Sequence, residues 1–297
     1  MGSNSPEILP PGSGSQNGGS SWENAPASAP AGTYTTPPVA PRRRKPVWLA
    51  APATHILVAI NCVVWLAMVA KHVSPFNPTV EQLMNWGASS AGNVLIEGQW
   101  WRIVTAMFLH VGILHLATNM WCLWNLGLLA EPLMGSWGVL AVYILTGAAG
   151  NLLSTFANWV WPMHESGAVV FPAGAGASGA VFGIAGALIV LLKSNRLPVP
   201  PVELKKLRRS VIYFAAINLF IGFSISFGTA VWGKGLNIDN YAHIGGCACG
   251  LLFAWPMVPR LGSSRPAFNL RLRIAVGIVV GLLVLFGFYI AHIPPQN

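Results

Sequence analysis

The chain has 297 residues, of which 54% are hydrophobic and only 8% are charged, and its mean hydropathy is +0.56. This composition is too apolar for an ordinary soluble domain and indicates a membrane protein. The net charge of +9 could suit nucleic-acid binding, but no stretch interleaves lysine or arginine with stacking aromatic residues, so no nucleic-acid partner is expected.

Residues 1–47 are rich in Gly, Ser, Pro, Asn and Ala and contain few large apolar side chains. A segment of this composition buries too little apolar surface to fold, so we expect it to be disordered. It ends in a basic stop at residues 42–45, and no apolar signal-peptide core precedes that stop. The first apolar segment is therefore expected to act as a signal anchor.

Seven apolar segments follow, and most approach the roughly 20 residues that a helix needs to cross the hydrocarbon core of a bilayer. The predicted fold is an all-α polytopic membrane protein. We expect a six-helix core over 48–258, a basic cytoplasmic loop over 259–273, and a seventh helix with a short outer tail over 274–297. The predicted spans cover residues 48–70, 108–130, 137–160, 178–192, 211–231, 241–258 and 274–293.

The distribution of positive charge predicts the orientation of these spans. Fourteen of the seventeen lysines and arginines lie within residues 42–45, 193–209 and 260–273, which fall on one side of the predicted membrane. Lys and Arg accumulate on the cytoplasmic side of membrane proteins. We therefore expect a multi-pass protein of a bacterial inner membrane, with its N-terminus in the cytoplasm and its C-terminus outside.

Several catalytic chemistries are disfavoured by what the sequence lacks. The chain has one aspartate, Asp239, in the loop before the sixth span, so the paired carboxylates of an aspartyl protease are missing. No HExxH pattern occurs, which argues against a common zinc protease. The four cysteines lie inside apolar segments, where we expect small buried hydrophobic groups. No metal and no cofactor is expected.

Polar side chains inside a membrane span are costly and are therefore candidates for function. Taken singly, a membrane serine usually bonds a nearby carbonyl, and an interfacial histidine is usually a packing group. Ser178, His243 and His115, however, fall at similar depths, about 21, 25 and 24 Å from the cytoplasmic ends of their spans at the helical rise per residue. A serine and a histidine at one depth suggest a nucleophile and its general base.

Two further features favour this pairing. The fourth span is too short to cross the bilayer, so a water-filled hollow is expected above Ser178, and hydrolysis needs that water. Glycines at four-residue spacing, Gly179 and Gly183 in the fourth span and Gly246 and Gly250 in the sixth, would let the two helices approach closely.

His115 and Asn119 are four residues apart and so share one face of the second helix. Both side chains can donate hydrogen bonds to a developing oxyanion, as can the Ser178 amide at the start of its helix. No acidic residue is expected at the depth of His243, so the predicted catalytic unit is a Ser178/His243 dyad.

Together these residues resemble the rhomboid family of intramembrane serine proteases, over about 48–258. The resemblance implies that Ser178 is the nucleophile, that His243 is the base, and that transmembrane protein substrates are cut in the outer part of their spans. It also implies an oxyanion hole of His115, Asn119 and the Ser178 amide. The matching motifs are Trp101-Arg102, His115-x-x-x-Asn119, Gly176-Ala177-Ser178-Gly179 and Ala242-His243-x-x-Gly246.

Other positions take their meaning from the same resemblance. The loop that holds Trp101 and Arg102 is similar to the membrane-embedded first loop of the family, and an interfacial aromatic belt is an equal alternative. His110 resembles a position near water at the site. Phe182 stands where relatives often carry a tyrosine that packs against the catalytic histidine, so the ring is kept and the hydroxyl is lost. The seventh helix resembles a subgroup with one helix added after the core.

Two other classes of function remain open. A catalytically inactive relative that acts as a membrane adaptor or chaperone typically lacks the serine or the histidine, and both are present here. A transporter would be expected to show inverted repeats and charged relay residues at mid-depth, and the sequence shows neither. The substrates' identity and the oligomeric state are left open.

Overall fold

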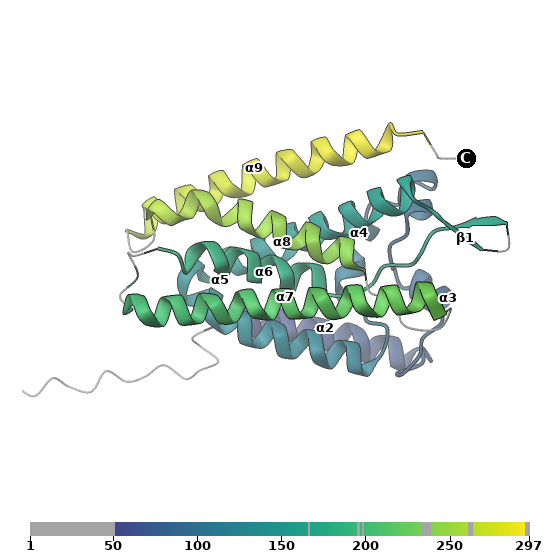
Figure 1. The fold of residues 1–297 in the computed structure, drawn as a ribbon, viewed down its shortest axis with the longest axis horizontal. Coiled ribbons are helices and arrows are strands. Elements are labelled where there is room, and N and C mark those ends of the chain that lie inside the picture. The colour runs from purple at the N-terminus through teal and green to yellow at the C-terminus, as the bar shows by residue number, and fades with distance from the viewer. Residues whose placement is uncertain are drawn as a thin grey trace, which may run out of the picture. The chain divides into compact units, whose positions relative to one another are not determined.

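The computed structural model describes residues 51–165, 167–194, 197, 199–232, 239–260 and 264–294. The predicted disordered region 1–47 lies outside these residues. The described chain is mostly helical, and its one sheet is a two-stranded hairpin, β1 paired with β2 (Figure 1). The elements in order are α2 (Pro52–Ala70), α3 (Val80–Asn85), η1 (Gly92–Ile96), α4 (Arg102–Thr105), η2 (Ala106–Phe108), α5 (Ile113–Val160), β1 (Met163–Glu165), β2 (Ala168–Val170), α6 (Ser178–Leu191), α7 (Pro201–Trp232), α8 (Asn240–Ala254), η3 (Trp255–Arg260) and α9 (Arg265–Ala291).

The helices agree with a protein that crosses a membrane several times. Among the described residues, four helical stretches are long and apolar enough to span, namely Pro52–Ala70, Ile113–Val160, Asn240–Val258 and Arg265–Ala291. The 48 residues of α5 are enough for two crossings. The all-α, polytopic class predicted from composition is therefore confirmed.

A kink divides α5 into the second and third predicted spans. Gly135 has a non-helical backbone, with φ 75° and ψ 167°, and Pro132 lies one turn before it. A positive φ is readily adopted by glycine, and proline lacks the amide that would continue the helix. The second span starts at Ile113 rather than at 108, because residues 106–108 form a separate 3₁₀ turn.

The kink also holds the start of α2. Glu131 accepts hydrogen bonds from the Ala53 and Thr54 amides, each at 2.9 Å, and from the Ser136 hydroxyl at 2.6 Å. Amides in the first turn of a helix have no partner within the helix, so the carboxylate satisfies two of them. A buried acidic side chain thereby ties the first span to the turn between the second and third.

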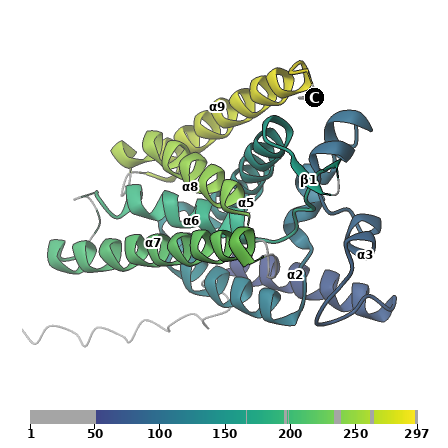
Figure 2. The same ribbon diagram turned by 45° about the vertical axis from the view of Figure 1, so that its right-hand side comes forward.

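The short helix α6 lies at the centre of the bundle, in contact with α5, α7 and α8 (Figure 2). Eleven of its 14 residues are buried. Glycine makes this packing possible: a Cβ on Gly246 would lie 2.0 Å from the Gly179 carbonyl oxygen, and a Cβ on Gly250 would lie 2.0 Å from that of Gly183. The backbones of α6 and α8 therefore touch, as the glycine spacing predicts.

Other elements also differ from the predicted ones. The last helix, α9, begins at Arg265, inside the loop predicted over 259–273 and nine residues before the predicted start at 274, because hydropathy marks only the apolar part of a helix. The fifth span lies within α7, which begins at Pro201, ten residues before the predicted start at 211. The hairpin formed by β1 and β2 was not predicted; its strands pair antiparallel across Gly167, which has φ 82°. Six paired residues next to long apolar helices are too short a signal for periodicity to reveal.

Candidate active site

Ser178 is the first residue of α6, at the end of an extended segment that is anchored on both sides. Gly174 exchanges two backbone hydrogen bonds with Ser89 of the first loop, at 2.9 and 2.6 Å. The Gly176 amide donates to the Ala106 carbonyl at 2.9 Å. These bonds hold the segment before α6 against the first loop, so backbone contacts set the place at which α6 and Ser178 begin.

Gly176 marks the point where Ser178 and His115 face each other. Its φ is 144°, and a Cβ built there would lie 2.7 Å from His115 Cε1, 3.1 Å from His115 Nε2 and 3.7 Å from Ser178 Oγ. Only a residue without a side chain fits between the imidazole and the hydroxyl. The predicted supporting glycine thus has a steric reason to be where it is.

His243 lies in the first turn and a half of α8 and is buried, with 7% of its surface exposed. Its ring stacks on Phe182 with centroids 4.4 Å apart and planes 12° from parallel. Phe182 stands one turn after Ser178 on α6, so this contact fixes the imidazole beside the helix that carries the serine. The ring packing that the sequence assigned to Phe182 is present.

Ser178 and His243 do not share a hydrogen bond within the described residues, and Nδ1 of His243 is buried without a partner. Catalytic hydrogen bonds are often long in the absence of substrate and tighten when substrate binds. No carboxylate makes a hydrogen bond to the His243 ring in the described part of the chain, although the N-cap of its helix, one turn earlier, is the acidic residue Asp239.

The candidate oxyanion donors gather on the second span. His115 Nδ1 is buried with no hydrogen-bond partner, and the Asn119 side-chain amide donates to the His115 carbonyl at 2.9 Å. That amide has a second hydrogen left to donate. The His110 ring lies 5.3 Å from the His115 ring, and both of its nitrogens are buried without partners. Unpartnered donors at one place are consistent with a site completed by substrate or water.

Trp101 and Arg102 build the first loop and do not reach the serine. The Arg102 guanidinium lies 4.6 Å above the Trp101 ring and donates to the Met84 and Ala88 carbonyls at 2.7 and 2.8 Å. Those carbonyls belong to α3 and to the segment after it. The pair therefore organises the loop scaffold around the site.

Asp239 is a functional candidate that sequence reasoning missed. The sequence places it in an outer loop, whereas the structure makes it the N-cap of α8, with its Oδ1 accepting the Ala242 amide at 3.0 Å. Burial raises the pKa of its carboxyl, opposed by hydrogen bonds from Ser154 and from backbone amides. The signal in the sequence was an aspartate just before an apolar helix, a common N-cap pattern.

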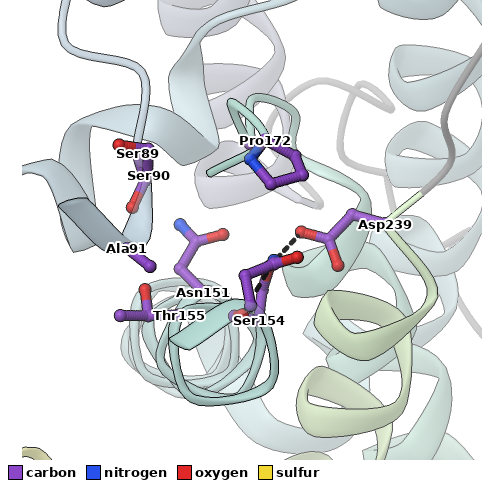
Figure 3. A pocket seen from close by; sticks show the side chains of 10 residues that line it. Ser89, Ser90, Ala91, Asn151, Ser154, Thr155, Pro172 and Asp239 are labelled. Carbon is purple, nitrogen blue, oxygen red and sulfur yellow. Dashed lines mark hydrogen bonds between the residues drawn. The ribbon is translucent and has the colours of Figure 1, made fainter. Parts of the chain in front are cut away.

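A small polar pocket adjoins this aspartate (Figure 3), and Ser178 is not among the residues that line it. Asp239 and Pro172 face the side chains that α5 presents across it. No cluster of three or more potential metal ligands occurs in the described residues. The pocket is lined by Ser89, Ser90, Ala91, Asn151, Ser154, Thr155, Asn158, Pro172, Gly174 and Asp239.

Comparison with known proteins gives a consistent result. Residues 97–260 match the family model described as Rhomboid domain. The Rhomboid protease GluP of Bacillus subtilis (strain 168) is 32% identical over 245 residues, which cover 82% of this chain and 41% of that protein. The Rhomboid protease AarA of Providencia stuartii is 29% identical over 251 residues, or 79% of this chain and 83% of that one. RHOMBOID-like protein 6, mitochondrial, of Arabidopsis thaliana is 30% identical over 237 residues, or 72% and 68%.

Proposed function

The chain belongs to the rhomboid family of membrane proteins, and on this premise we propose that it is an intramembrane serine endopeptidase that uses a Ser178/His243 dyad. Two of the similar proteins are named proteases, which supports peptide hydrolysis as the reaction. The observation that supports the proposal best is the Phe182 stack, which holds the His243 ring beside the helix that begins with Ser178.

In this mechanism the Ser178 hydroxyl attacks the carbonyl carbon of the scissile peptide while His243 takes its proton. The same histidine then gives that proton to the leaving amine. A water molecule, activated by His243, attacks the acyl-enzyme and releases the second product, and the proton returns to Ser178 Oγ. Every step requires the His243 ring to stay beside the Ser178 hydroxyl and the bound substrate. The close contact of α6 and α8 supports that placement.

The negative oxygen of the tetrahedral intermediate would be stabilised by His115, Asn119 and the Ser178 amide. His115 Nε2 and Ser178 Oγ both lie within 4 Å of the point where a Gly176 Cβ would be. A donor at the place where charge develops contributes to catalysis only if it is preorganised. The extended segment before α6 and the helix that carries His115 and Asn119 supply that rigidity.

We propose transmembrane proteins as substrates, cut in the outer part of their spans, and a bacterial inner membrane as the location. Both proposals rest on the depth of Ser178 and on the two similar bacterial proteins. An inactive adaptor would keep the same fold, so the chemistry of Ser178 must be tested directly.

The test is labelling with a fluorophosphonate, followed by mapping of the modified residue. We expect the probe on Ser178, with no labelling and no cleavage of a model transmembrane substrate in Ser178→Ala. His243→Ala should be equally inactive, and the double variant no worse, because residues acting as one catalytic unit are not additive. An unlabelled Ser178 together with full cleavage by Ser178→Ala would end the proposal.

A further inference from the structure

Asp239 joins two helices through one buried carboxylate. Its Oδ1 accepts the Ala242 amide in the first turn of α8 at 3.0 Å, and its Oδ2 accepts the Ser154 hydroxyl of α5 at 2.5 Å. Figure 3 shows the Ser154 side chain directed at this carboxylate. The two residues are 85 positions apart in the chain, so the bond fixes the start of α8 against the outer half of α5.

The Ser154 hydroxyl is oriented by a further neighbour. The Asn158 side-chain amide donates to the Ser154 carbonyl at 2.9 Å and to its hydroxyl at 3.2 Å. A hydroxyl that accepts one bond has its own proton free for another acceptor, and here that acceptor is the carboxylate. A continuous series of hydrogen bonds thus runs from the Asn158 amide through the Ser154 hydroxyl to the Asp239 carboxylate.

The same carboxylate lies near the segment that leads to Ser178, and Asp239 and Gly174 line one small pocket. A Cβ on Gly174 would lie 3.5 Å from Asp239 Oδ2, an ordinary van der Waals distance. Gly174 precedes Ser178 by four residues, and Asp239 precedes His243 by four. The segments that carry the proposed nucleophile and base therefore come close together at this carboxylate, four residues before each of the two side chains.

The donors to this carboxylate are neutral in the part of the chain that the structure describes: a serine hydroxyl and backbone amides. Its contribution is hence that of a helix cap and a cross-link, which needs an acceptor oxygen and not a negative charge. Asparagine and aspartate are about equally good N-caps, so Asp239→Asn keeps the cap. Its side-chain NH2 would stand in place of Oδ2 and could keep the cross-link by donating to the Ser154 hydroxyl oxygen.

We propose that Asp239 is a positioning residue for His243, which sets the register of α8 against α5 and against the segment before Ser178. The expected effect on turnover rests on the proposed function, whereas the expected effect on the structure of α8 does not. Without the cap, the first turn of α8 loses its fixed start, and the His243 ring moves relative to the Ser178 hydroxyl. A displacement of about 1 Å in a catalytic group can lower the rate by about 100-fold.

The experiment compares Asp239→Ala, Asp239→Asn and Ser154→Ala in the full chain, with Ser136→Ala as the matched control. Ser136 makes the same kind of hydroxyl-to-carboxylate bond, to Glu131 at the kink in the middle of α5. Measurements are kcat and KM per folded molecule on a model substrate, the melting temperature, and hydrogen exchange of amides in the first turn of α8.

We expect Asp239→Ala to lower kcat by about 10-fold to 100-fold with little change in KM, and to speed amide exchange at the start of α8. Asp239→Asn should restore most of both properties. Ser154→Ala, which keeps the cap and removes the cross-link, should lose less, and Ser136→Ala should keep wild-type kcat. The rescue by asparagine separates positioning from any use of the charge.

Three results would overturn the proposal: full kcat per folded molecule in Asp239→Ala, no rescue by Asp239→Asn, or loss of kcat that follows the melting temperature in every variant. If Asp239→Ala does not fold, unchanged kcat and exchange in Ser154→Ala would overturn it. If the wild-type protein neither cleaves nor takes the probe, the proposed function fails separately. Hydrogen exchange in the first turn of α8 then tests the inference, and exchange rates in Asp239→Ala equal to those of the wild type would reject it.

Discussion

The plane of the His243 ring is set by one aromatic neighbour, Phe182, whose ring lies almost parallel to it at 4.4 Å. A phenylalanine gives no hydrogen bond to the imidazole, so its contribution is packing alone. The edge that faces the serine side is left for the reacting groups. The stack therefore does not depend on the tyrosine hydroxyl that the family resemblance led us to expect at this position.

Phe182→Ala is therefore expected to lower kcat by about 10-fold to 100-fold, because the ring of the base is no longer held in place. Phe182→Tyr, which keeps the stacked ring, should retain turnover. The control is Phe214→Ala: Phe214 packs on Phe182 from α7, with centroids 6.3 Å apart, and does not stack on His243. Steady-state turnover on a model substrate measures all three, and equal losses in Phe182→Ala and Phe214→Ala would contradict the prediction.

Asn119 offers a second prediction at this scale. If its free amide hydrogen stabilises the oxyanion, Asn119→Ala should lower kcat by about 100-fold to 1,000-fold with KM almost unchanged. Asn125→Ala is a matched control, because Asn125 makes the same side-chain bond to the carbonyl four residues earlier, at 2.7 Å, on an exposed face of the same helix. A variant at Asn119 that melts early but turns over normally per folded molecule would assign Asn119 to structure.

At the scale of elements, the contact between α6 and α8 relates the two proposed catalytic residues. Its glycines allow the two backbones to touch, so the helices cannot move closer together, and any added side chain must push them apart. Interiors packed this closely respond to a single added methyl group. The close approach serves the site as well as the fold, because Ser178 is on one of these helices and His243 is on the other.

Gly246→Ala tests this contact. Its Cβ would meet the Gly179 carbonyl oxygen at 2.0 Å, so the helices must separate, at a cost of about 1–3 kcal/mol for overpacking. We expect a lower melting temperature and a larger loss of turnover than the folded fraction explains. Gly277→Ala on α9 is the control, since nothing lies within 4 Å of its Cβ and alanine favours a helix. If both variants behave alike, the contact does not matter for activity.

At the scale of the whole molecule, the basic residues of α7 and α9 lie at the end of the bundle where both helices start. Figure 1 shows that α7 and α9 start at the same end of the helical bundle, and α9 finishes at the end where the β1 hairpin lies. Lys205, Lys206, Arg208 and Arg209 lie in the first turns of α7, and Arg265, Arg271 and Arg273 lie in those of α9. The basic residues therefore collect at the end away from the hairpin.

The topology prediction follows from this asymmetry. A reporter enzyme placed after Asn297 should behave as periplasmic, and one inserted in 193–209 should behave as cytoplasmic. Accessibility of a cysteine introduced at Val202, which is exposed near the start of α7, gives an independent measurement from the cytoplasmic side. A cytoplasmic reporter after Asn297 would reverse the proposed orientation of the site.

The sequence by itself predicted the helical membrane class, the short fourth helix and the close contact of the glycine-bearing helices, and the family resemblance implied the ring of Phe182 against His243. The features predicted from the residues alone depend on local patterns: a run of apolar residues whose length can be compared with the bilayer, or a glycine every fourth position. Each can be recognised within a window of about 20 residues.

Only the tertiary structure decided the place of Asp239, the role of Arg102 in the first loop and the hairpin before α6. The partner of Asp239 is Ser154, 85 residues away, and the carbonyls that receive Arg102 are 14 and 18 residues from it. Hydrogen-bond partners at such separations are chosen by how the helices pack, because a buried polar group takes whichever acceptor or donor the fold brings near it. Hydropathy carries no information about that choice, so a residue assigned to an outer loop could prove to be the cap of the helix that holds His243.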